Sequence, residues 1–163
     1  MRKIEMIVIH CSATREDASC PLETLRMWHL QRGFSDIGYH YYITRDGALH
    51  EGRRLEVPGA HAAGFNAFSI GVCYEGGLDA AGRCADTRTP AQKDAMDVLV
   101  KRLVRRYPGI TKIVGHRDLS CDADGDGIVE RHEWVKQCPC FDAAAEYGSF
   151  ALWNAGRKGG SND

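Results

Sequence analysis

Ile4-Glu5-Met6-Ile7-Val8-Ile9-His10, residues 4–10 of the 163-residue chain, is the stretch that decides the fold. From Ile4 to Ile9 it is a short apolar run rich in isoleucine and valine, which is typical of a buried strand. Two positive charges precede it, but the run is too short for a signal peptide and no small-residue cleavage site follows. We therefore expect a buried strand here, and synthesis in the cytoplasm without a classical export signal.

Helix and strand signals alternate along the rest of the chain. Thr89 as N-cap followed by Pro90 is the strongest helix start, and apolar residues at helical spacing continue from there to about residues 108–109. An earlier helix is expected to begin near Pro21 and to end at Gly33, which can adopt a left-handed conformation. Further strands are expected over residues 39–44, 48–51, 69–74 and 112–114.

The composition fits one soluble domain. Apolar residues make up 44% of the chain, charged residues 26%, and the formal net charge is -1. This balance does not indicate a nucleic-acid partner, and no apolar run is long enough to cross a bilayer. Alternating strands and helices without internal repeats predict an α/β fold with a mixed central β-sheet flanked by helices. We expect one monomeric domain over residues 1–155 and a flexible tail over residues 156–163.

The cysteine count is high but does not indicate a disulfide framework. The chain has seven cysteines, an odd number, and it is long enough to fold without covalent cross-links. We therefore expect free, buried or metal-bound thiols, which fit a reducing compartment. Cys140 in particular is expected to be a packed thiol.

Three residues at the ends of predicted strands or in a distinctive loop are candidate metal ligands. His10 follows residues 7–9, His116 follows residues 113–115, and Cys138 opens the stretch Cys-Pro-Cys-Phe-Asp. Zinc prefers nitrogen and sulfur ligands, and three protein ligands leave a fourth position for water. Taken singly, each residue also fits a structural histidine or a buried thiol, since ligands so far apart in sequence have no local signature.

Several spaced motifs together resemble the type 2 N-acetylmuramoyl-L-alanine amidases, the family that includes phage lysozyme-amidases and peptidoglycan recognition proteins. The stretches that carry the resemblance are Ile9-His10-Cys11-Ser12-Ala13-Thr14, Trp28-His29, Gly38-Tyr39-His40, Arg45-Asp46-Gly47, His61 to Gly64, Asn66 to Gly71, Gly115-His116-Arg117-Asp118, and Cys138-Pro139 with Phe141-Asp142. They occur in the family's order and span residues 4–142.

The resemblance implies a zinc-dependent amidase that cleaves the bond between N-acetylmuramic acid and L-alanine in peptidoglycan. It implies zinc ligation by His10, His116 and Cys138, catalytic roles for Tyr39 and Lys136, and a substrate-binding position for His61. These roles suit the chemistry, because zinc makes water a usable nucleophile near neutral pH. A lysine can stabilise the oxyanion, and a tyrosine can hold the water or assist proton transfer.

Residues 122–133 fit a second metal, calcium. Asp122, Asp124, Asp126 and Glu133 fall at liganding positions of an EF-hand loop, the Ile128 carbonyl would add a further oxygen, and Gly127 holds the sharp sixth position. The alternative is an acidic surface loop that binds nothing. Because the family's connection between the second histidine and the cysteine is shorter, residues 118–137 are interpreted as an inserted calcium-loop segment. We hypothesise that calcium orders this segment and thereby positions Lys136 and Cys138.

Other functions remain open at this stage. A non-catalytic peptidoglycan-binding module is disfavoured because all three candidate ligands are present. An enzyme without a signal peptide fits a phage or prophage endolysin that acts on the cell wall, which we favour, or a cytoplasmic amidase that recycles wall fragments. The expected partner is therefore peptidoglycan or a soluble muropeptide, with no nucleic acid and no membrane insertion.

Overall fold

Strand β1 (Met6–Cys11) is an interior strand of a five-stranded sheet in the computed structural model, which describes residues 1–158. It pairs in parallel with β5 (Ser69–Tyr74) on one side and with β7 (Lys112–Gly115) on the other. Strand β3 (Tyr41–Ile43) continues the sheet parallel to β5, and β4 (Leu49–Glu51) closes that edge antiparallel to β3. The order β4-β3-β5-β1-β7 confirms the predicted mixed sheet.

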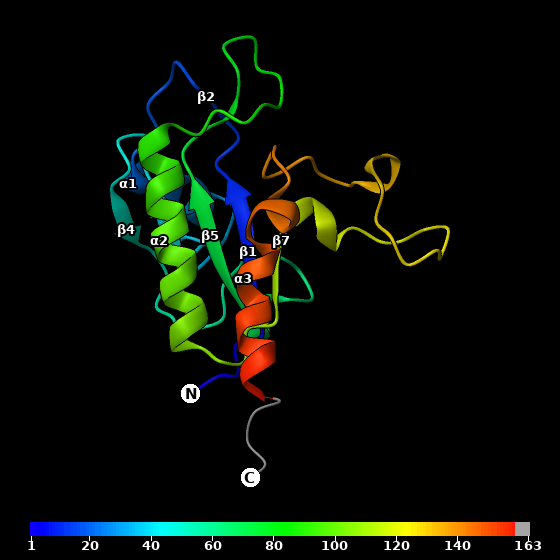
Figure 1. Ribbon diagram of the computed structural model, residues 1–163. Coiled ribbons are helices and arrows are strands. Elements are labelled where there is room, and N and C mark those ends of the chain that lie inside the picture. Colours follow the sequence, from blue (N-terminus) through cyan, green and yellow to red (C-terminus); the bar gives the residue numbers. More distant parts are fainter. Residues whose placement is uncertain (159–163) are drawn as a thin grey trace.

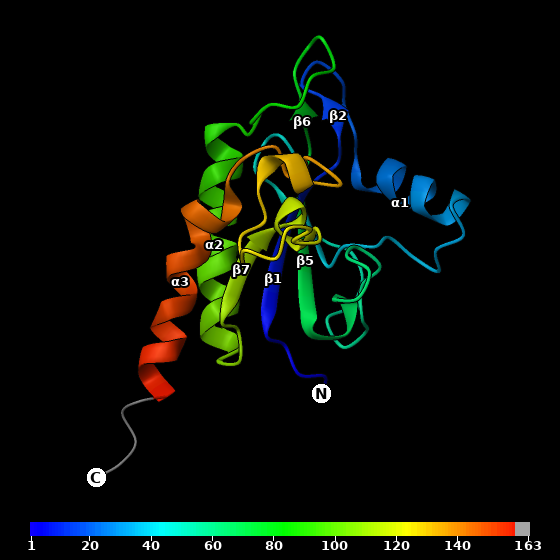
Figure 2. The same cartoon turned by 90° about the vertical axis from the view of Figure 1, so that its right-hand side faces the viewer.

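Helices cover both faces of this sheet. Figures 1 and 2 show α2 (Pro90–Arg106) and α3 (Ala143–Lys158) side by side on one face, and α1 (Leu22–Gln31) on the other. The remaining elements are the two-residue strands β2 (Thr14–Arg15) and β6 (Gly77–Leu78) and the 3-10 helices η1 (Asn66–Phe68), η2 (His116–Leu119) and η3 (Arg131–Glu133). Within the described residues, no helix combines the length and apolarity that a membrane span requires.

Side-chain alternation along the strands separates the core from the functional face. Ile7 and Ile9 of β1 pack with α2 and α3 in the main hydrophobic core. Because successive side chains of a strand point to opposite faces, His10 points instead toward the side covered by α1. A smaller cluster lies on that side and includes Leu25 of α1 and Cys73 of β5. One buried strand thus supplies the core on one face and a polar ligand on the other.

The predicted helices and strands begin and end close to the observed bounds, and β5 matches its predicted range 69–74. Helix α2 begins as expected, with the Thr89 hydroxyl accepting from the Gln92 amide and the Gln92 side chain accepting from Thr89, which completes a capping box. Helix α1 ends before Gly33, whose φ is 90°. The strand predicted over 39–44 is shorter, from Tyr41 to Ile43. Tyr39 and His40 therefore lie directly before the first residue of β3.

The C-terminal region differs from the prediction. Residues 143–158 form α3, which the sequence analysis did not predict and which continues three residues into the expected flexible tail. Its stability has a clear source, because Ala143, Tyr147 and Ala151 are buried at helical spacing against the core. Residues 159–163 of the predicted tail lie outside the described residues.

The expectation that the cysteines are unpaired is wrong for two of them. Cys84 and Cys140 form a disulfide with their Cα atoms 5.5 Å apart, within the usual range for such a bond. Cys140 is therefore cross-linked to the connection before α2, and it is not a free packed thiol. The remaining five cysteines are free, and an odd total did not exclude one pair. Fifty-six positions separate the two residues, so only the fold could reveal the pairing.

The segment 118–137 projects from the domain between β7 and α3, and Figure 1 shows it in yellow to orange at the side of the sheet. Its two ends meet at its base, where the Arg117 amide donates to the Cys138 carbonyl over 2.8 Å. The Arg117 guanidinium also lies 4.0 Å from the centre of the Trp134 ring. The segment is therefore a loop closed at its base on the body of the domain.

Candidate active site

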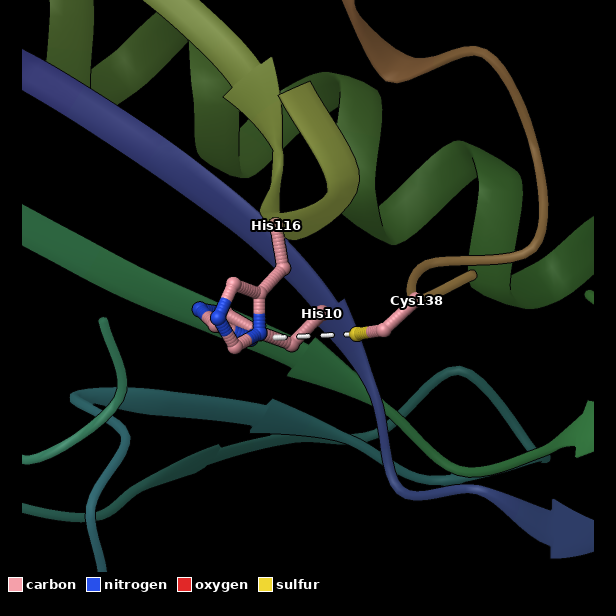
Figure 3. A group of neighbouring side chains, drawn as sticks. All are labelled: His10, His116 and Cys138. Carbon is pink, nitrogen blue, oxygen red and sulfur yellow. Dashed lines mark hydrogen bonds between the residues drawn. The ribbon is translucent and has the colours of Figure 1, made fainter. Parts of the chain in front are cut away.

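The structure brings the three predicted zinc ligands together. His10 comes from β1, His116 from the start of η2 directly after β7, and Cys138 from the loop before α3. Their ligand atoms all lie within 4.8 Å of one another, and the Cys138 sulfur is 3.8 Å from His10 Nδ1. Figure 3 shows the two imidazoles and the thiol converging on one point. Neighbouring β1 and β7 bring the histidines together, since both strands run parallel and end at the same edge.

His10 is fixed on every side. It is 1% exposed, its backbone lies within the paired strand, and its Nε2 is 2.9 Å from His61 Nδ1. His61 in turn has its Nε2 3.2 Å from the Ser69 hydroxyl. The Asn66 side chain accepts from the backbone amides of His61 and Ala62, which holds the His61 segment. The nitrogen of His10 that faces Cys138 is thus Nδ1, and the other nitrogen is occupied by His61.

Burial keeps the histidines of this cluster neutral. It lowers the pKa of His10 well below 6.5 and the pKa of His61 to about 3. The pKa of His116 is lowered to about 4 by burial and then by the nearby cation of Lys136. The neutral imidazole is the form that binds a metal. The pKa of Cys138 is raised by its hydrogen bond with the Cys11 side chain and by burial. A bound cation reverses that preference, because a coordinating thiol loses its proton.

The two predicted catalytic residues lie around this centre. The Tyr39 ring centre is 5.0 Å from that of His10 and 5.4 Å from that of His29. Burial and the neighbouring thiols of Cys73 and Cys138 raise the pKa of Tyr39 well above 10, so its hydroxyl keeps its proton. Lys136 is exposed on the inserted segment, and its charge reaches both histidine ligands.

A cavity of about 640 Å³ opens beside the three ligands. Its lining combines His116 and Cys138 with Tyr39, His61 and Lys136, so it brings together all the predicted catalytic and substrate-binding residues. Trp28, His29, Arg32 and Phe34 also line this cavity. A smaller hollow of about 210 Å³ shares His116 and Lys136 with it and is lined on its other side by residues of the inserted segment. A branched substrate could therefore occupy both cavities, with its branch point beside His116 and Lys136.

Cys138 is held by residues that the sequence analysis did not single out. The Cys11 amide donates to the Cys138 sulfur over 3.3 Å. The next residue is fixed as well, because the Tyr74 hydroxyl donates to the Pro139 carbonyl over 2.6 Å. Cys140 then carries the disulfide to Cys84. The only signal for this anchoring in the sequence was the Cys-Pro-Cys stretch itself.

His29 and His40 each hold a nearby backbone amide. His40 Nδ1 accepts from the Gly71 amide, and His29 Nδ1 accepts from the Gly38 amide. The His40 ring lies 5.8 Å from that of His61, and the Tyr39 ring lies 5.0 Å from that of His10. Both histidines therefore help to fix the backbone around the site.

The acidic loop gathers three of its five predicted ligands. Carboxylate oxygens of Asp122, Asp124 and Glu133 lie within 4.8 Å of one another. Asp126 accepts from the Ile128 amide, and the Ile128 side chain is exposed. Gly127 has a φ of 90° at the sixth position, as the EF-hand pattern requires.

Comparisons with known proteins show which family the chain resembles. The family model described as N-acetylmuramoyl-L-alanine amidase matches residues 1–140. The endolysin of Klebsiella phage KP32 is 35% identical over 141 residues, covering 86% of this chain and 83% of the phage protein. The endolysin of Escherichia phage T7 is 35% identical over 140 residues, covering 85% and 82%. Among solved structures, the N-acetylmuramoyl-L-alanine amidase LysC from Clostridium intestinale superposes with a TM-score of 0.69 at 29% identity, covering 93% of this chain and 86% of LysC.

Proposed function

Because this chain belongs to the N-acetylmuramoyl-L-alanine amidase family and is an enzyme of that class, we propose that it is a zinc-dependent hydrolase of the phage lytic type. Its substrate is peptidoglycan or a muropeptide. The bond cleaved is the amide between the lactyl group of N-acetylmuramic acid and the L-alanine of the stem peptide. The observation that carries the proposal is the convergence of His10, His116 and Cys138 at the edge of a cavity.

The three residues fit a zinc ion. A tetrahedral zinc with bonds of about 2.0–2.3 Å separates its ligand atoms by about 3.4–3.8 Å. For one nitrogen and one sulfur ligand the expected separation is about 3.5 Å. The 3.8 Å between His10 Nδ1 and the Cys138 sulfur is close to that value. Two neutral imidazoles and one thiol are also the donor types that zinc prefers, and three protein ligands leave one position open. A zinc ion bound there supplies Lewis-acid activation of water near neutral pH.

The side chains around the ligands then divide the work. Lys136 stabilises the negative charge that develops on the scissile carbonyl oxygen, which its ammonium group can do without a proton transfer. Tyr39 orients the attacking water or assists proton transfer as a hydrogen-bond donor, since its raised pKa keeps the phenol protonated. His61 lines the same cavity on the substrate side.

The lytic role rests on similarity to phage endolysins over most of both chains. Such an enzyme is made in the cytoplasm, acts on the cell wall and works as a monomer. Recycling of soluble wall fragments is the alternative. Digestion of purified sacculi separates the two roles, because a lytic enzyme releases stem peptides from intact wall, whereas a recycling amidase cleaves only soluble muropeptides.

Metal content tests the proposed centre directly. Purified wild type is expected to hold one zinc per chain, and Cys138→Ala is expected to lose the zinc and the amidase activity together. Mass spectrometry of metals, beside release of free L-alanine termini from muropeptide, checks both. If wild-type protein contains no zinc, and still cleaves muropeptide when none is added back, the proposal is contradicted.

The inserted segment would bind calcium as a separate site. The proposal is supported by the EF-hand spacing of residues 122–133 and by the proximity of Asp122, Asp124 and Glu133. Calcium titration into protein stripped with a calcium-selective chelator is expected to show one ion per chain, with binding lost in Glu133→Gln. If calorimetry shows no heat of calcium binding to the wild type, and calcium does not shift its melting temperature, the loop is only an acidic surface loop.

A further inference from the structure

We propose that His61 is a positioning residue for the metal centre: it accepts the Nε2 proton of His10 and, with Ser69 behind it, fixes the tautomer and the ring orientation in which His10 presents Nδ1 to zinc. The inference rests on the proposed zinc site. It assigns to His61 a role distinct from contact with substrate, and it gives Ser69 a role that neither the sequence motifs nor the comparisons assign.

The direction of the hydrogen bonds follows from the ligand atoms. His10 Nδ1 faces the Cys138 sulfur, so this nitrogen must be unprotonated to bind a metal. The single proton of the neutral ring then sits on Nε2, which lies 2.9 Å from His61 Nδ1. His61 must accept at Nδ1, so its own proton sits on Nε2, 3.2 Å from the Ser69 hydroxyl. Each donor in this chain has one acceptor. Reversing His61 alone would set two protons against each other, and reversing His10 alone would set two lone pairs against each other.

The His61 ring has no freedom to leave this position. It is 7% exposed, and Ser69 is fully buried. A Cβ added at Gly71 would lie 2.6 Å from ring atoms of His61, and a Cβ added at Gly59 would lie 2.5 Å from its Cδ2. Two glycines therefore leave the space that the imidazole fills. A side chain packed this closely suits a fixed acceptor better than a group that adapts to a substrate.

The energetic consequence is a loss of zinc affinity when the acceptor is removed. Metal-bound histidines almost always donate their other ring N–H to a partner, and removing that partner typically costs about 10- to 100-fold in affinity or activity. Here the partner is a neutral imidazole and not a carboxylate. It orients His10 without adding negative charge to the site.

A matched pair of substitutions tests the inference. In His61→Asn the amide oxygen takes the place of Nδ1 and can still accept from His10, whereas His61→Leu fills similar space without an acceptor. We expect His61→Leu to raise the zinc dissociation constant about 10- to 100-fold and His61→Asn to restore most of that loss. Zinc affinity is measured by competition with a chromophoric chelator, without substrate. His40→Gln is the control, because His40 is also buried and hydrogen-bonded but touches no ligand.

A second readout follows the proton itself. Long-range ¹H–¹⁵N correlation spectra of the metal-free protein are expected to show His10 as the Nε2–H tautomer in wild type and as a tautomer mixture in His61→Leu. Should His61→Leu not fold, Ser69→Ala replaces it, and a smaller loss of affinity with partial tautomer mixing is expected.

The outcomes separate this inference from the proposed function. Equal zinc affinity in wild type and His61→Leu, or equal losses in His61→Leu and His61→Asn, would overturn the positioning role while leaving the zinc site intact. A wild type that binds no zinc would overturn the proposed function instead.

Discussion

The two sides of the proposed zinc site are built in different ways. On one side, His10 lies in the interior strand β1, is 1% exposed, and has β5 and β7 paired to its strand and His61 against its ring. On the other side, Lys136 lies on an exposed segment whose carboxylates mostly accept hydrogen bonds from their own loop, as Asp122 does from Gly125 and Gly127. The positions of the two histidine ligands are therefore set by the sheet, whereas the position of Lys136 depends on local order in the loop.

Cys138 belongs to the first side although it follows the loop. The Arg117–Cys138 backbone hydrogen bond closes the segment at its base, and Cys11 and the disulfide at Cys140 hold what comes after it. We therefore revise one expectation. If calcium orders the loop, it should act on Lys136, and it should leave Cys138 and the zinc in place.

Removing the disulfide should have the largest effect on stability. Cross-linking positions 56 residues apart restricts the unfolded chain, which corresponds to about 4 kcal/mol at most in the loop-entropy model. The double variant Cys84→Ser/Cys140→Ser should therefore unfold at clearly lower urea concentration than wild type. Cys121→Ser, which removes an exposed free thiol, is the control. A double variant as stable as this control would show that the cross-link does not stabilise the side of the site that contains Cys138.

Lys136→Ala should separate catalysis from metal binding. Loss of an oxyanion-stabilising group typically lowers kcat about 100-fold or more. Since Lys136 lies in the loop and is not a ligand, the zinc content should not change. Steady-state hydrolysis of a muropeptide and metal analysis of the same sample check both parts. Loss of zinc together with activity would mean that the loop also holds the ligands.

Calcium removal should give a partial version of the same result. Chelation with zinc retained is expected to lower kcat by less than Lys136→Ala does, because a less ordered loop still reaches the productive position part of the time. The effect should vanish in the Lys136→Ala background, where loop order no longer matters for catalysis. An equal calcium effect in both backgrounds would contradict the proposed link between the loop and Lys136.

The smallest expected effect is the contribution of His40 to the pH dependence of stability. Burial lowers the pKa of His40 to about 4, against about 6.5 in an unfolded chain. Between these values the unfolded state binds more protons, so the stability of the metal-free protein should fall as pH decreases from about 6.5 toward 4, by at most about 1.4 kcal/mol per pH unit for this group. The free energy of unfolding, measured with urea at pH 7 and at pH 5.5, should therefore decrease less in His40→Gln than in wild type. An equal decrease in both proteins would assign the pH dependence to other groups.

The sequence by itself determined the elements that rest on local signals. Thr89-Pro90 set the start of α2, Gly33 marked the end of α1, and the isoleucine-rich run marked the buried strand β1, because caps, left-handed glycines and apolar runs act over a few residues. The family motifs also contained the three candidate ligands His10, His116 and Cys138, although nothing in their spacing could show that they meet.

Only the tertiary structure decided the features that join distant residues. The Cys84–Cys140 disulfide, the His10–His61–Ser69 chain and the closure of the inserted loop at Arg117 and Cys138 link positions up to 56 residues apart. Helix α3 likewise became evident only through the core it buries. Such contacts depend on which strands pair and which faces pack, and the free energy that selects them comes from the whole fold. A pattern read along the chain does not contain it.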